Sequence, residues 1–218
     1  MIKIYRLPIF FLLMLCSTFS RSSAFIDHGL SVSRAMASFY MYGVSEGDDR
    51  YKIDYKKHLA EAERQLFNIN KNHPEAAKTL QPLWADLRPR LAYDYDEYTG
   101  YYVTGLGQGR FRLYLNSYYT EYKKIEFKKK TFEDRLLHMQ VNMEVILARF
   151  FDLASAAFVD EGSLDGTEPA INTQYIADNI TRELAAMLKM SAGKAYQGDL
   201  QQVERKWQFI QKSVVNSQ

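Results

Sequence analysis

Apolar residues recur at alternating steps of four and three between residues 111 and 157, with one polar interruption at Lys129. Such a heptad pattern is typical of a long helix that packs almost parallel to its neighbours. Its apolar positions are Phe111, Leu115, Tyr118, Tyr122, Ile125, Phe132, Leu136, Met139, Met143, Ile146, Phe150, Leu153 and Ala157. Thr131 and Asp134 have the spacing of a helix N-cap. Because the pattern keeps its phase across them, we expect one continuous helix.

Three further stretches of the chain carry helical patterns. They cover residues 26–70, 74–98 and 171–215, and short connections join the four helices. Short connections favour antiparallel neighbours, so that the apolar faces of the four helices bury one another. The sequence therefore predicts an all-α protein, built as an elongated antiparallel up-down-up-down four-helix bundle with long, partly broken helices.

Glycine and proline residues mark where these helices are expected to bend or break. Gly43 and Gly47 lie inside the first stretch and predict a kink there. Pro82 and Pro89 lie inside the second, where each removes a backbone donor and crowds the preceding turn. Residues 101–104 then alternate as a short strand would, but the sequence shows no partner strand for them.

Residues 1–24 have the pattern of a secretory signal peptide. Lys3 and Arg6 precede a short apolar stretch, and small residues at 22–24 offer a cleavage site. The apolar stretch is too short to span a bilayer. We therefore expect a protein secreted to the periplasm, with a single helical-bundle domain at residues 25–218. An uncleaved N-terminal anchor is the alternative.

Removal of the signal peptide changes the charge balance of the chain. The full sequence has 28 Lys and Arg residues against 26 Asp and Glu residues, and Lys3, Arg6 and Arg21 precede the cleavage site. The mature protein would therefore have 25 basic residues against 26 acidic ones, a formal net charge of −1. This balance gives no general attraction to nucleic acid. The single cysteine, Cys16, is also lost, which excludes disulfides and thiolate metal sites.

Tyrosine and arginine residues gather near the second connection. In the antiparallel layout, Arg34 of the first helix reaches the same end of the bundle as Tyr98, Tyr102, Arg112 and Tyr118. Arginine offers a forked donor for carboxylate or phosphate, and tyrosine offers rigid amphipathic area. The sequence predicts that this end binds a protein partner or a small anionic or aromatic ligand. The alternative is that these side chains merely cover the tip of the bundle.

One histidine and four methionines form a second candidate site. Met139 and Met143 share a face of the third helix beside His138, and Met187 and Met190 lie on the fourth helix. Thioether and imidazole ligands suit Cu(I) or haem. The same methionines also fit the apolar pattern as core fillers. A metal- or haem-binding helical bundle is therefore the alternative function.

No catalytic constellation is evident in the sequence. The four histidines form no haem-attachment or zinc motif, and we expect them at the surface or at the edge of the core. In architecture alone, the layout is similar to the periplasmic four-helix ligand-binding domains of bacterial chemoreceptors. We therefore expect a non-catalytic protein without a cofactor. It would bind a partner protein or a small ligand as an accessory to a signalling or envelope system.

Overall fold

The structure, a computed structural model, describes residues 24–45, 47–91, 93–96, 100–103, 105–125, 131–156 and 172–215. The expected signal peptide thus lies almost wholly outside the described residues, and its cleavage stays a prediction. Within the described ranges the protein is all-α apart from one small β-hairpin. None of the helices in these ranges is long and apolar enough to cross a membrane.

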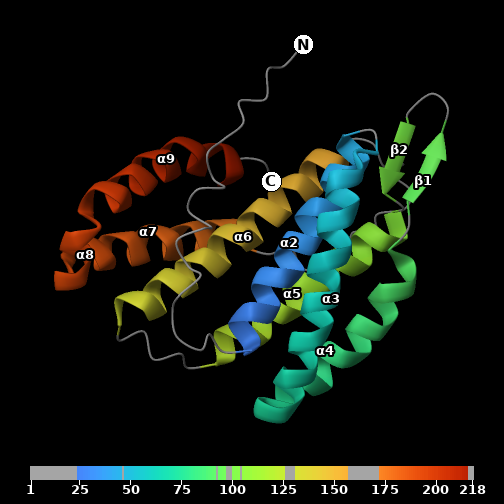
Figure 1. The fold of residues 1–218 in the computed structure, drawn as a ribbon, viewed down its shortest axis with the longest axis horizontal. Helices are drawn as coiled ribbons and strands as arrows, with labels where there is room; N and C mark the ends of the chain where they lie inside the picture. Colours follow the sequence, from blue (N-terminus) through green and yellow to red (C-terminus); the bar gives the residue numbers. More distant parts are fainter. Residues whose placement is uncertain are drawn as a thin grey trace.

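Eight α-helices are described, with the labels of Figure 1. They are α2 (Ala24–Val44), α3 (Asp49–Asn72), α4 (Pro74–Leu87), α5 (Gly105–Lys124), α6 (Phe132–Ala156), α7 (Thr173–Lys189), α8 (Ser191–Ala195) and α9 (Gln197–Val215). A short 3-10 helix, Arg88–Arg90, follows α4. Pro82 lies inside α4 without ending it.

The first predicted helix is a hairpin of two helices rather than one kinked helix. The chain reverses after α2, so that α3 packs antiparallel along it (Figure 1). Gly47 has φ 88°, in the left-handed region that favours glycine. Asp48 then caps α3, because its side chain accepts a hydrogen bond of 3.0 Å from the N–H of Arg50. The expected kink is therefore a complete reversal.

The long third helix is also divided, and the prediction of one continuous helix is wrong. α6 begins after a reciprocal cap, in which Thr131 Oγ1 accepts from the N–H of Asp134 at 3.0 Å. The Asp134 carboxylate in turn accepts from the N–H of Thr131 at 3.2 Å. Contacts near the break join the end of α5 to the start of α6, and contacts far from it join the start of α5 to the end of α6. The two helices are therefore antiparallel.

The chain between α4 and α5 contains a β-hairpin. β1 (Tyr93–Asp96) pairs antiparallel with β2 (Gly100–Val103), with Tyr93 opposite Val103. The alternating pattern at residues 101–104 therefore does mark a strand. Its partner is the segment that we expected to continue the second helix, so the helical prediction for residues 74–98 is wrong beyond the 3-10 turn.

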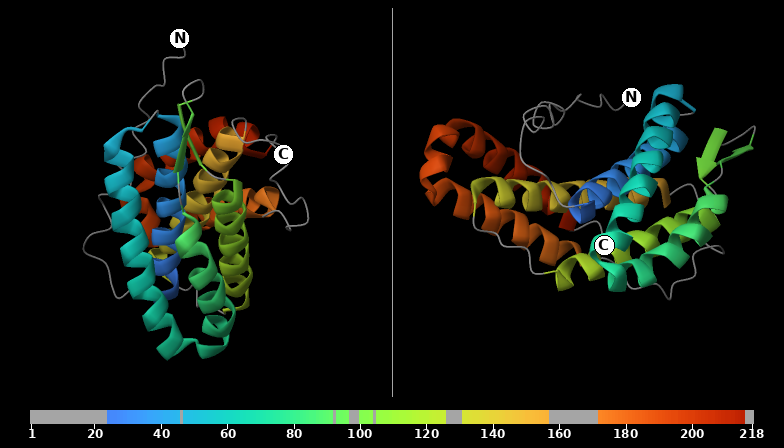
Figure 2. Two further views of the ribbon diagram at one scale, coloured as in Figure 1. Left: turned by 90° about the vertical axis from the view of Figure 1, so that its right-hand side faces the viewer. Right: turned by 60° about the horizontal axis from the view of Figure 1, so that its bottom comes forward.

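α2 lies at the centre of the packing. It contacts α3, α5 and α6, while α3 contacts α4 and α4 contacts α5. On the other side of α2, α7 packs against α6, and α9 packs against α7 (Figure 2). The packing is therefore a multi-helix arrangement that is not clearly a simple four-helix bundle.

A close approach of α2 and α5 depends on Gly29. A Cβ atom at this position would lie 1.9 Å from the hydroxyl oxygen of Tyr118. That hydroxyl is buried and donates a hydrogen bond of 3.0 Å to the carbonyl of Phe25. Any side chain at position 29 must therefore displace a fully buried tyrosine.

We expect Gly29→Ala to lower the free energy of unfolding by about 1–3 kcal/mol, since Tyr118 must leave its hydrogen bond and repack. Chemical denaturation of the parent and the variant measures this loss. Gly198→Ala is the matched control, because no heavy atom lies within 4 Å of a Cβ at that helical position. The control should be neutral or slightly stabilising. Equal losses in both variants would contradict the close approach of α2 and α5.

Candidate functional site

Of the five residues that were predicted to form one end of the bundle, the structure describes the side chains of three, Arg34, Arg112 and Tyr118, and these three have separate partners. Tyr118 is fully buried between α2 and α5, where its ring stacks on Phe25. Tyr98 lies outside the described residues, and only the backbone of Tyr102 is described, in β2. Tyr118 is thus part of the core, and binding by the two other tyrosines stays a prediction.

The two arginines of that prediction pair with two different carboxylates of α6. Arg34 Nε donates to Glu144 Oε1 at 2.9 Å. Arg112 makes two hydrogen bonds of 2.9 Å each with Asp152, which is fully buried. Burial raises the pKa of Glu144, and the nearby charge of Arg34 opposes this shift. Since their partners are about two helical turns apart on α6, Arg34 and Arg112 occupy separate places in the fold.

The candidate metal ligands lie in or against the apolar core. Met139 and Met187 are buried core residues, while Met143 and Met190 are partly buried and pack against the core. The ring of His138 is buried and hydrogen-bonds through Nδ1 to the hydroxyl of Tyr122. Among the described residues, no group of three or more His, Cys, Asp or Glu side chains could hold a metal ion. This burial favours core filling by Met139 and Met187; a methionine-based site stays a prediction.

The expectation of peripheral histidines is wrong for His28, as it is for His138. His28 is fully buried where α2 meets α3, α4 and α5. Its Nδ1 lies 2.8 Å from the Ala62 carbonyl, which can only accept, so Nδ1 carries the proton. Its Nε2 therefore accepts from the Tyr114 hydroxyl at 2.7 Å. Burial lowers the pKa of His28 from 6.5 to about 4, so the ring is neutral at neutral pH.

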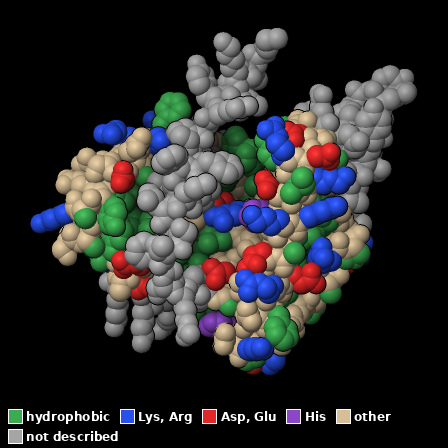
Figure 3. All heavy atoms as spheres, viewed as in Figure 1, with side chains coloured by type: hydrophobic (Ala, Val, Ile, Leu, Met, Phe, Trp, Pro, Cys, Tyr) green, Lys and Arg blue, Asp and Glu red, His purple; other side chains and the backbone are tan. Residues whose placement is uncertain are grey.

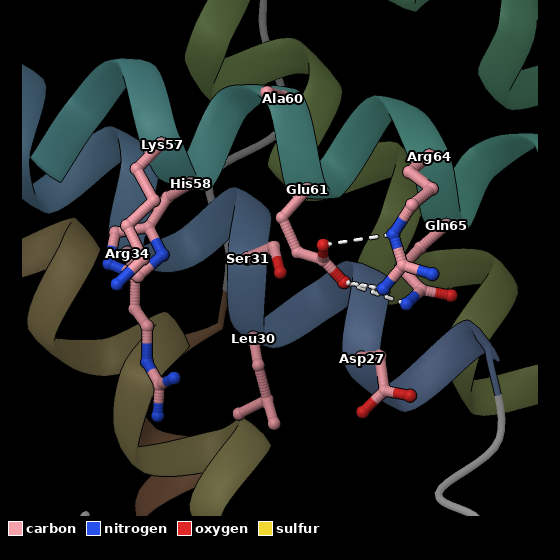
Figure 4. Close-up of a pocket in the computed structure, with 10 residues that line it drawn as sticks. All are labelled: Asp27, Leu30, Ser31, Arg34, Lys57, His58, Ala60, Glu61, Arg64 and Gln65. Atoms are coloured by element: carbon pink, nitrogen blue, oxygen red, sulfur yellow. Dashed lines mark hydrogen bonds and ion pairs between the residues drawn. The ribbon is translucent and has the colours of Figure 1, made fainter.

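An open groove between α2 and α3 is the candidate binding site. It has a volume of about 760 Å³, and both helices contribute polar side chains to it (Figure 4). Its lining residues are Asp27, Leu30, Ser31, Arg34, Lys57, His58, Ala60, Glu61, Arg64 and Gln65. On the same face of the molecule, basic side chains gather around a histidine over α2 and α3 (Figure 3). The reversal at Gly47 creates this site, because it places the polar faces of the two helices side by side.

At one end of the groove, the polar side chains form hydrogen bonds with one another. Glu61 accepts hydrogen bonds from Arg64 Nε at 3.0 Å and from Gln65 Nε2 at 2.8 Å. The hydrogen bonds from Arg64 lower the pKa of Glu61, so this carboxylate is charged at neutral pH. Asp27 has an interaction partner as well. We call this part of the groove, formed by Asp27, Glu61, Arg64 and Gln65, the paired end.

The opposite end, formed by Arg34, Lys57 and His58, has donors that are not used; we call it the basic end. Lys57 and His58 extend from α3 towards Arg34 on α2 (Figure 4). In the described part of the chain, neither Lys57 nor His58 makes a hydrogen bond or an ion pair. Burial lowers the pKa of His58, and the positive charges of Arg34 and Lys57 lower it further. The carboxylates of Asp54 and Glu61 oppose this shift. The ring is half-buried, neutral at neutral pH and open to the groove.

Sequence reasoning missed this groove. Its residues belong to one predicted helix, in which a continuous axis would have placed Arg34 and His58 about 36 Å apart. No family model matches the chain, and no curated protein or solved structure shows a significant match. The function is therefore inferred from the groove and the residues that line it.

Proposed function

We propose that the protein is a non-catalytic binding protein and that the groove between α2 and α3 holds a small polar ligand. The observation that carries this proposal is the pair of unused donors, Lys57 and His58, inside an open groove of about 760 Å³. Small-molecule sites commonly have volumes of this order and use a few convergent polar groups to orient the ligand. A partner protein remains the alternative occupant.

The proposal includes no reaction. Ser31 and His58 both line the groove, but no hydrogen bond joins their side chains. A general base must come within hydrogen-bonding reach of the nucleophile that it activates. The basic end instead offers donors, which suits holding a ligand.

We also propose that α2, α3, α4 and α5 form an up-down-up-down bundle, although these are not the four helices expected from the sequence; α6 packs on α2, α7 on α6 and α9 on α7. Trp84 packs on Tyr114, and Asp86 pairs with Arg110, which supports an antiparallel α4 and α5. The contact of α2 with α5 closes the ring of four helices. In this arrangement the groove lies on the outside of the bundle, along the first helical hairpin.

We propose a periplasmic location after removal of residues 1–24, in a protein that serves as an accessory to a signalling or envelope system. The support is the charged and apolar pattern of residues 1–24. N-terminal sequencing of secreted material, which should begin near Phe25, tests the cleavage. Retention of Met1 in the membrane fraction would contradict it.

We expect Ala60→Trp to abolish ligand binding, because Ala60 is exposed and lines the groove, so that an indole there obstructs the groove without entering the core. A thermal-shift screen of anionic, cationic, zwitterionic and neutral small molecules is run on the mature parent and on the variant. Compounds that occupy the groove raise the Tm of the parent and leave that of the variant unchanged.

Ala185→Trp is the matched control, since Ala185 is also an exposed helical alanine but lies on α7, away from the groove. The control should respond to ligands as the parent does. The groove is not the binding site if no compound of any class stabilises the parent more than it stabilises Ala60→Trp.

A further inference from the structure

We infer that the basic end of the groove binds an oxyanion, the phosphate or carboxylate group of a small ligand, with Lys57 and His58 as its donors. This inference rests on the proposed function of the groove. It assigns a chemical class to the ligand, and it follows from which polar groups of the groove are already engaged and which are not.

Most of the unused hydrogen-bonding capacity at the basic end is that of donors, although the neutral His58 ring has one acceptor nitrogen as well. The Lys57 ammonium has three N–H donors, and none is engaged by the residues that the structure describes. The His58 ring also has no partner in this part of the chain. The complement of such a surface is a ligand rich in acceptors.

The acceptors at the paired end are engaged, which argues against a cationic ligand. The Glu61 carboxylate holds both Arg64 and Gln65, and Asp27 has its own partner. An ammonium group would have to compete with the guanidinium of Arg64 for Glu61. An oxyanion at Lys57 and His58 displaces no such contact.

Arg34 adds positive charge beside these donors and is held in place from behind. Its guanidinium turns towards α6, where Nε donates to Glu144 at 2.9 Å (Figure 4). This ion pair is half-buried on the arginine side and buried on the carboxylate side, so it fixes the guanidinium and offsets much of its charge. Lys57 therefore supplies the net charge of the basic end, and protonation of His58 would add a second.

Protonation of His58 should accompany oxyanion binding. The charged groups that face this ring are Arg34 from α2, together with Asp54, Lys57 and Glu61 from α3. Glu144 of α6 lies behind Arg34, and Arg64 neutralises Glu61. A bound anion would counteract the effect of Arg34 and Lys57 on the imidazole. Affinity for an anion that does not itself titrate should therefore rise as the pH falls.

The direct test is titration calorimetry of the mature protein with inorganic phosphate, sulfate and succinate. We expect Lys57→Ala and His58→Gln each to weaken binding of the preferred oxyanion by about tenfold, the scale of one hydrogen bond to a charged group. Lys56→Ala is the matched control, because this exposed neighbour does not line the groove. Asp54→Asn removes an acid near His58 and should tighten binding, a gain that damage to the fold would not produce.

The pH arm uses sulfate, which stays a dianion over the range tested. Its affinity for the parent should be higher at about pH 5.5 than at about pH 8, and His58→Gln should remove this difference. Because Lys57 is exposed, its variant keeps the test decisive even if His58→Gln does not fold. Comparison of phosphate with succinate tells which oxyanion the site prefers.

The outcomes separate this inference from the proposed function. Oxyanion binding that is unchanged in Lys57→Ala overturns the inference. The inference is also overturned if only neutral or cationic compounds bind and Ala60→Trp blocks their binding. In that case the groove is still a ligand site, as the proposed function states. If no small molecule of any class binds in the groove, both the inference and the proposed function fail.

Discussion

Asp152→Ala is expected to lower the free energy of unfolding by about 3–5 kcal/mol, the largest loss that we expect from a single substitution in this protein. Asp152 is fully buried on α6 and accepts hydrogen bonds from Arg112, from Arg149 and from Gln108. The side chains of Arg112 and Arg149 are only 16% and 13% exposed. Removal of the carboxylate would leave two largely buried guanidinium groups without their shared counter-ion.

Chemical denaturation of matched variants measures this effect. Asp152→Asn keeps the shape and part of the hydrogen bonding, so its loss should fall between those of the parent and Asp152→Ala. Glu75→Ala is the control, since Glu75 and its partner Lys78 are 81% and 71% exposed, and exposed ion pairs contribute little. A loss in Asp152→Ala no larger than that in Glu75→Ala would mean that the antiparallel pairing of α5 with α6 is not held by this carboxylate.

The free energy of unfolding should fall by about 3 kcal/mol as the pH decreases from about 6.5 to about 4, because of His28. The pKa of this buried ring is about 4 in the folded protein, against 6.5 for the free side chain. Between these values the unfolded chain binds a proton and the folded protein does not. The contribution of His28 is therefore complete above pH 6.5 and is lost as the pH falls towards the folded pKa.

Denaturation curves recorded over this pH range, with an NMR titration of the ring, test the assignment. In His28→Gln the free energy of unfolding should decrease by about 3 kcal/mol less between pH 6.5 and pH 4 than it does in the parent. This holds whether or not the variant is less stable overall. His58→Gln is a useful comparison, because burial lowers the pKa of His58 in the same direction. If His28→Gln keeps the whole pH dependence of the parent, the buried histidine is not its cause.

The helical class of the protein could be predicted from periodicity, but the ends of the helices could not. The heptad phase continues from α5 into α6 because both helices bury the same kind of apolar face, although they run in opposite directions. Phase alone therefore does not distinguish a long helix from a helical hairpin. The local signal was correct, since Thr131 and Asp134 do form the cap that begins α6.

The candidate site was less predictable, because it depends on how separate helices meet. Arg34 and Glu144 are distant in sequence, and their pairing follows only from the packing of α2 on α6. The groove itself requires the reversal at Gly47. The burial of His28 did leave a signal: it lies three residues after Phe25 and four before Val32, in helical phase with two core residues.

The central position of α2 also affects the order in which the protein can fold. α2 is the first of the described helices to be synthesised, yet it contacts α5 and α6, which follow much later in the chain. Contacts between residues so distant in sequence slow folding, since a long loop must close before they form. The apolar face of α2 thus has no complete partner until α6 has been made. This order of synthesis is compatible with the proposed export, which requires passage through a membrane before the core closes.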